Sequence, residues 1–285
     1  MMTRSRALAS IHLAAVLFGL TAILGELIRT DAIAITAGRS AFAVATLLLV
    51  LRSQGGSLWR NITPTSIALP TLAGALLAVH WVSFFLAVKT GGVAMATLGF
   101  ASFPAFITLG ERFLFREAIH RDEWCVLALV SLGLILVTPS VDPADQNAVG
   151  LAWGLFSGFS FGLFTLANRR AAGGFSASRL AAIENLVVLV LTLPFAVSGL
   201  GGMHAIDWFW LAVLGTLCTA FSHALLVASL SVLKARSAAV VIALEPVYAI
   251  GFAALLFGQI PDLRALAGGC LMVAAIAWSA LRRAD

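Results

Sequence analysis

Glu245 lies nine residues into an apolar stretch that begins at residue 236, directly before Pro246. A carboxyl group within a membrane-length stretch is costly to bury and by default marks a ligand or proton pathway. The proline removes a backbone hydrogen bond, so a carbonyl group one turn earlier becomes free to accept a ligand. We interpret Glu245 as a group that binds a substrate ammonium or carries a coupling proton. The alternative is a neutralised carboxyl group that only fixes helix packing.

His80 and His223 occupy matching places in two apolar stretches, and Trp81 and Phe84 stand close to His80. Both histidines could line a central cavity together with these aromatic side chains. Alternatively, each is a hydrogen-bonded packing residue. No further His, Cys or carboxylate lies at ligand spacing, so the pattern predicts neither a metal site nor a cofactor.

Two pairs of opposite charges connect neighbouring stretches near their ends. Arg39 pairs with Glu26, and Glu184 pairs with Arg170 at the end of the preceding stretch. We interpret them as structural ion pairs near the membrane interface, with substrate binding as the alternative.

Glycines recur at every fourth residue between residues 148 and 168, at Gly154, Gly158 and Gly162. This double GxxxG pattern predicts close approach of another helix. Trp153 and Phe156 on the same stretch are expected to face an outward-open cavity, unless they serve as interfacial anchors.

Residues 91–115 combine small and polar residues with Pro104, which is typical of a bendable helix beside a transport pathway. Bending at Pro104 and Pro246 would provide a gate on each side of the site. The predicted substrate site comprises His80, Trp81, Phe84, Met95, Gly99, Phe103, Trp153, Phe156, His223, Glu245 and Tyr248.

The elements that position these residues are apolar runs of about twenty residues, the length that crosses a bilayer as a helix. The chain is 61% hydrophobic and 11% charged, with a mean hydropathy of +1.02. We therefore predict an all-α integral membrane protein with ten transmembrane helices. The predicted spans are 7–28, 32–51, 66–88, 91–115, 122–139, 148–168, 178–198, 206–231, 236–258 and 262–281.

Residues 80–119 and 222–261 carry one pattern twice, and the prolines at 104 and 246 stand 142 positions apart. Five spans in each copy force the copies into opposite orientations, so the pattern predicts two inverted repeats. Their boundaries are 1–139 for the first repeat, 140–147 for an outer linker and 148–285 for the second repeat.

Basic residues cluster on one side of the predicted topology, which holds 14 of the 18 Lys and Arg residues. This bias predicts cytoplasmic N- and C-termini in a bacterial inner membrane. The partners are then the lipid bilayer and a small-molecule substrate, and the protein is a monomer or a weak homodimer. A nucleic-acid partner is not predicted, because no exposed domain carries a basic face.

The chain resembles the EamA type of the drug/metabolite transporter superfamily. The resemblance rests on the prolines of the fourth and ninth spans, on Arg39, on Leu114-Phe115-Arg116-Glu117 and on Leu244-Glu245-Pro246-Val247. Gln259 departs from the family, whose second half usually has glutamate at this place. In size and layout the chain is similar to aromatic amino-acid exporters of the YddG type.

The favoured function is a secondary transporter or facilitator that exports small metabolites by alternating access. The resemblance implies amino acids, and the aromatic interior suits aromatic or other apolar ones. The alternatives are a transporter of other drugs or metabolites, or a lipid-linked flippase subunit. A membrane-embedded enzyme is disfavoured, because the spans lack clustered metal ligands and nucleophile–base motifs.

Overall fold

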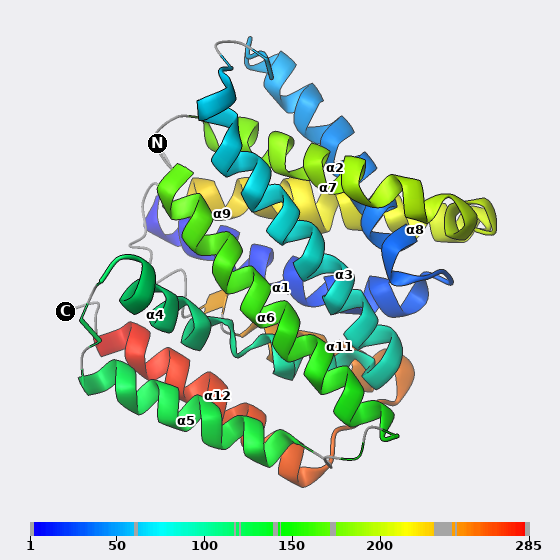
Figure 1. Cartoon of the computed structure of the whole chain (residues 1–285). Helices are drawn as coiled ribbons and strands as arrows, with labels where there is room; N and C mark the ends of the chain where they lie inside the picture. The colour runs from blue at the N-terminus through cyan, green and yellow to red at the C-terminus, as the bar shows by residue number, and fades with distance from the viewer. Residues whose placement is uncertain are drawn as a thin grey trace.

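The computed structural model describes residues 3–59, 62–116, 118–119, 121–138, 142, 144–171, 175–230, 241–242 and 244–282, and every regular element in these ranges is a helix (Figure 1). The helices are α1 (Arg4–Leu27), α2 (Ala32–Ser53), α3 (Pro64–Phe100), α4 (Phe103–Leu114), α5 (Arg121–Val137), α6 (Gln146–Ala171), α7 (Ala177–Gly201), α8 (Ala205–Gly215), the π-helix η1 (Thr216–Phe221), α9 (Ser222–Leu230), α11 (Glu245–Phe257) and α12 (Leu263–Arg282).

Six helical segments are long and apolar enough to cross a membrane, and three shorter apolar helices accompany them. The long segments are Arg4–Leu27, Ala32–Ser53, Pro64–Phe100, Gln146–Asn168, Ser178–Gly201 and Ala205–Leu226, and the shorter ones are Glu123–Val137, Glu245–Phe257 and Leu263–Trp278. The described part of the chain is therefore an all-helical membrane protein. The span predicted at 236–258 begins outside the described residues.

Local capping explains where several helices begin and end. The Asp31 carboxylate accepts hydrogen bonds from the backbone N–H groups of Ile33 and Ala34, each at 2.9 Å, and so starts α2. At the end of α1, the Lys89 ammonium donates to the Ile28 carbonyl at 2.6 Å. A cation at a helix C-terminus satisfies carbonyl groups that lack an intrahelical donor.

The third and fourth predicted spans meet in a turn without a loop, inside α3. Gly92 has a φ of 76° and a ψ of 178°, a conformation that residues with a Cβ atom rarely adopt. His80 contacts Ser157 of α6, Gly91 lies against Gly150, and Gly99 lies back against Gly154. The chain therefore runs antiparallel to α6 before Gly92 and parallel to it afterwards.

The fourth predicted span is interrupted before its proline. Helix α3 ends at Phe100, residues 101–102 form a turn, and α4 begins at Phe103. Pro104 occupies the first turn of α4, as Pro246 does in α11. A proline is tolerated in a first turn because the backbone N–H group that it lacks would have no intrahelical acceptor there. The predicted span 91–115 is therefore divided between two helices, and Pro104 lies in the first turn of the second one.

Three helix pairs organise the bundle: α3 with α6, α2 with α7, and α5 with α12 (Figure 1). The glycines predicted to allow close helix approach lie at the first pair. A methyl group at Gly154 would stand 2.7 Å from the Ala96 carbonyl oxygen, and one at Gly158 would stand 2.9 Å from the Phe100 carbonyl oxygen. The sequence prediction for this stripe is confirmed. In Figure 1 the first turn of α1 and the last turn of α12 lie on the same side of the bundle.

Candidate functional site

Arg39 of α2 is a buried cation that contacts α3 and η1, and it is only 4% exposed. Its guanidinium carbon lies 3.9 Å from the centroid of the Trp81 ring, and its Nε donates to the Thr219 hydroxyl at 2.7 Å. Its Nη1 atom is buried and has no hydrogen-bond partner. A buried charged donor without an acceptor costs free energy, so this atom is prepared for a ligand that brings an anionic oxygen.

The acceptor for Arg39 stands on the π-helix η1, between α8 and α9. The Thr219 hydroxyl also donates to the Leu214 carbonyl, five residues earlier, at 2.8 Å. Single π-turns inside α-helices occur frequently at functional sites because they change the register of side chains on a helix face. Here the π-turn places Thr219 against the guanidinium of Arg39.

Glu245, at the first position of α11, is the carboxylate that faces this cation. It is partly exposed and lies within electrostatic range of Arg39. Among the described residues it makes no hydrogen bond and no ion pair within 4.0 Å. The bundle therefore holds a guanidinium and a carboxyl group near each other but not directly paired, an arrangement that can engage both ends of a zwitterion.

An aromatic cluster adjoins the charged pair, and His80 lies inside it. The imidazole lies 5.1 Å from the Phe100 ring centroid and 4.9 Å from that of Phe161. Phe103, at the start of α4, stacks on Phe100 at 5.1 Å. The Ser157 hydroxyl holds the imidazole through Nδ1 at 2.8 Å. These contacts fix the ring and leave Nε2 as the nitrogen available to a ligand.

The structure brings together five predicted site residues, namely His80, Trp81, Phe84, Phe103 and Glu245. The same cluster holds four residues that are not among the predicted site residues: Phe100, Ser157, Phe161 and Thr219. Phe161 and Ser157 stand one helical turn apart on α6, and this spacing is the signal that could have placed both on the face toward His80.

Met95 and Gly99 lie in packing contacts instead. Met95 belongs to a buried cluster that includes Val130 of α5 and Met272 of α12. A methyl group at Gly99 would stand 2.7 Å from the Leu151 carbonyl oxygen, so this glycine allows α3 and α6 to cross.

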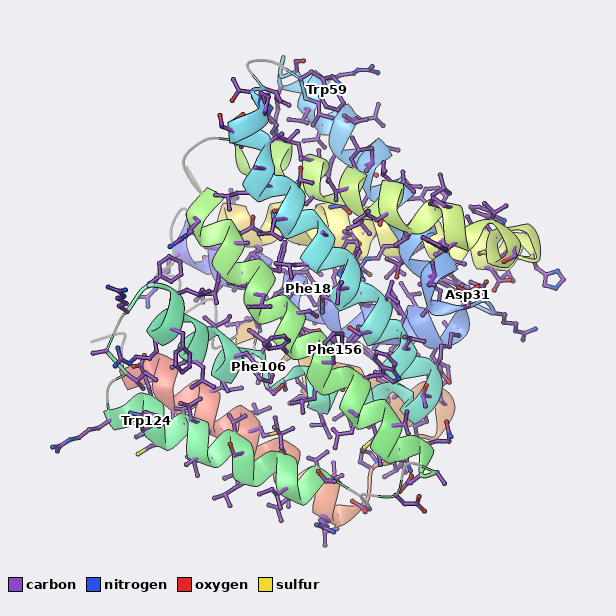
Figure 2. All side chains as sticks on the ribbon, viewed as in Figure 1. Phe18, Asp31, Trp59, Phe106, Trp124 and Phe156 are labelled. Atoms are coloured by element: carbon purple, nitrogen blue, oxygen red, sulfur yellow. The ribbon has the colours of Figure 1, made fainter. Side chains whose placement is uncertain are left out.

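Trp153 and Phe156 also lie outside the cluster, on a face of α6 where they are 38% and 44% exposed. Phe156 lies near Phe159, and Phe159 in turn contacts Phe106 of α4. Figure 2 shows Phe156 and Phe106 on these two neighbouring helices. An exposed aromatic row of this kind is typical of a surface that contacts lipid.

His223 and Tyr248 occupy other positions on the second half of the chain. His223 on α9 is partly exposed, and the Tyr248 hydroxyl lies 3.4 Å from Nδ1 of the exposed His12 on α1. A histidine–tyrosine contact therefore joins α11 to α1, at a different place from the Arg39 guanidinium.

Among the described residues, neither predicted ion pair, Arg39 with Glu26 or Glu184 with Arg170, is present. Arg39 turns toward Trp81 and Thr219, while the Glu26 carbonyl accepts a hydrogen bond from the Lys89 ammonium at 3.2 Å. Arg170 lies with its guanidinium carbon 5.1 Å from the Phe115 ring centroid. The guanidinium groups of Arg39 and Arg170 therefore contact the faces of aromatic rings, and proximity in sequence did not predict these partners.

Glu184 is left as a buried carboxylate without its predicted cation. It is 4% exposed, its Oε1 has no hydrogen-bond partner, and Asn168 lies within hydrogen-bonding reach. Within the described residues, no three His, Cys, Asp or Glu side chains gather where they could hold a metal ion.

A bundle of apolar helices that buries an arginine with one unsatisfied nitrogen beside an aromatic cluster is typical of a membrane transport protein. The model of the EamA-like transporter family matches this chain twice, at residues 5–138 and 148–281. The chain belongs to the EamA-like transporter family.

Similar proteins agree with this assignment. An uncharacterised transporter of Archaeoglobus fulgidus is 26% identical over 274 residues, which cover 95% of each chain. An uncharacterised transporter of Pseudomonas aeruginosa is 28% identical over 160 residues, 55% of this chain and 49% of that protein. A solved crystal structure shares the fold with a TM-score of 0.68 at 18% identity and covers 99% of both chains. The family and the names of the relatives indicate a transporter rather than an enzyme.

Proposed function

We propose that this transporter exports amino acids with aromatic or other apolar side chains. The single observation that carries the proposal is the buried Nη1 of Arg39, which has no partner while Glu245 lies within electrostatic range. An α-carboxylate would supply the acceptor that Nη1 lacks, and an α-ammonium would face the Glu245 carboxylate. The partly exposed rings of Phe103 and Phe161 provide apolar surface beside them.

We further propose ten transmembrane helices in two inverted repeats, residues 1–139 and 148–285, joined by an outer linker at 140–147. Reciprocal packing supports this arrangement: α3 and α4 of the first half pack on α6, while α9 and α11 of the second half pack on α1. The two family matches on either side of the linker support it as well. Such symmetry allows one site to open to either side of the membrane in turn.

The proposed location is a bacterial inner membrane with both termini in the cytoplasm, supported by the bias of basic residues and by the common side of α1 and α12 ends. The breaks at residues 101–102 and before Glu245 are the proposed gates. A helix break with a proline in the next turn provides a bending point because few backbone hydrogen bonds cross it.

Counterflow in proteoliposomes that contain only this protein tests the substrate class. Phenylalanine carries both charges, phenethylamine only the ammonium and 3-phenylpropionate only the carboxylate. We expect counterflow of labelled phenylalanine and competition by unlabelled phenylalanine well above that by either singly charged analogue. Equal competition by all three compounds would overturn a zwitterion site, and flux of a labelled lipid without amino-acid flux would favour the flippase alternative.

A further inference from the structure

Glu184 on α7 is the buried ionisable group that the proposed substrate site does not use. Its Oε1 is buried without a partner, and so is the Oδ1 of the neighbouring Asn168. The Glu184 backbone packs against α3, where a methyl group at Gly74 would stand 2.9 Å from its carbonyl oxygen. The site thus combines a carboxylate and an amide, and it lacks donors for two buried oxygen atoms.

The described cations on the surrounding helices have other partners. On α2, Arg39 bonds to Thr219, and Arg52 is exposed. On α3, Lys89 donates to the Ile28 carbonyl, and the His80 imidazole is held by Ser157.

The same holds for the described cations of the two helices that carry the site. Arg170 of α6 lies over Phe115, and Arg179 of α7 donates to the Leu58 carbonyl at 2.9 Å. The side chain of Arg169 lies outside the described part of the structure. An ionised carboxylate buried without a cation is costly, whereas a protonated carboxyl group is neutral and provides a donor.

We propose that Glu184 is the proton-coupling site of this transporter. A proton binds to the carboxylate to give the neutral acid while the site is buried, and it leaves when the α3–α7 contact opens to water. A proton fits better than a metal ion, because hard cations take about six oxygen ligands. This inference rests on the proposed transport function but not on the substrate class.

The position of Glu184 suits such a role. It is the eighth residue of α7, just as Arg39 is the eighth residue of α2. Glu245, the other candidate for coupling, lies within electrostatic range of Arg39, and the proposed function assigns it to the substrate ammonium. The proton and the substrate therefore have separate sites on the equivalent helices of the two proposed repeats.

Glu184→Gln tests the proposal, because glutamine imitates the neutral acid and should fold. In proteoliposomes we expect this variant to keep phenylalanine counterflow, which needs no net proton movement, and to lose the acceleration of net uptake by a pH gradient. Glu26→Gln, a partly exposed carboxylate on α1, is the matched control and should keep both activities. Glu245→Gln should weaken counterflow while leaving the residual uptake sensitive to the pH gradient.

Each outcome decides the inference. A Glu184→Gln variant that still responds to the pH gradient overturns it, and so does wild-type uptake driven by a Na⁺ gradient alone. If Glu184→Gln loses both activities, Glu184→Asp decides: a shifted pH midpoint of uptake supports the site, and an unchanged midpoint overturns it. Absence of wild-type counterflow would instead contradict the proposed function.

Discussion

Arg39 and Glu184 occupy the same position in the second helix of each proposed repeat. They share the packing of their backbone but differ in the charge and the surroundings of their side chains. Each carbonyl packs on a glycine of a helix from the other half: Arg39 on Gly215 of α8, and Glu184 on Gly74 of α3. Their side chains differ in charge and in surroundings. Arg39 stacks on Trp81, while Glu184 lies beside Asn168.

At this position the contact of the backbone carbonyl with a glycine occurs in both halves, whereas the charge of the side chain differs between them. In the two proposed inverted repeats, similar packing at this position supports a mechanism of alternating access. In our two proposals, an anionic group of the substrate binds to Arg39 in one half, and a proton binds to Glu184 in the other.

Arg39→Gln should abolish most phenylalanine counterflow. A hydrogen bond to a charged group contributes about 1.5–3 kcal/mol, so we expect a loss of about ten- to a hundredfold. Arg39→Lys keeps the charge but not the fork of donors and should recover part of the rate. Arg52→Gln on the same helix is exposed and serves as the control. Normal counterflow by Arg39→Gln would place substrate recognition elsewhere.

Gly74→Val and Gly215→Val should destabilise the protein to a similar degree. At both positions the added side chain meets backbone atoms of the facing helix, which cannot move aside cheaply. We expect a loss of about 1–3 kcal/mol, seen as a lower melting temperature in detergent. Gly251→Ala on α11 meets no atom within 4 Å and is the control. A large effect at only one of the two positions would break the structural equivalence of the halves.

Trp81→Leu should weaken substrate affinity more moderately. The variant removes the ring beneath the guanidinium of Arg39, a contact whose contribution is about 0.5–2 kcal/mol. The KM for phenylalanine should rise by a corresponding factor, while Trp81→Phe should retain most of the affinity. If Trp81→Leu changed only the response to a pH gradient, the two sites would not be separate.

Phe156→Leu should have the smallest effect. The ring is exposed on α6, and surface substitutions usually change free energies by less than about 0.5 kcal/mol. We expect counterflow within about twofold of wild type. In contrast, Phe161→Leu removes a ring that contacts His80 and should reduce counterflow. A larger loss of counterflow in Phe156→Leu than in Phe161→Leu would indicate that Phe156 contacts the substrate.

The sequence alone predicted the helical membrane class and the glycine contacts of α6, because length, hydropathy and small-residue spacing are local properties. It did not predict the partners of Arg39, because Trp81 and Thr219 come from helices distant in sequence. The π-turn that positions Thr219 also leaves no pattern in hydropathy. Proximity in sequence favours Glu26 and Arg170 as the partners of Arg39 and Glu184, but it contains no information on an aromatic ring that competes with a carboxylate for a guanidinium.

Whether Arg39 binds the substrate carboxylate is tested most directly by measuring the affinity of wild type and of Arg39→Gln for two ligands. These ligands are phenylalanine and phenylalaninamide, which lacks the carboxylate. If the Nη1 of Arg39 receives the substrate carboxylate, calorimetry on the purified protein should show wild type preferring phenylalanine by about tenfold or more, and Arg39→Gln losing that preference. An equal preference in both proteins would contradict the claim that Arg39 binds the substrate.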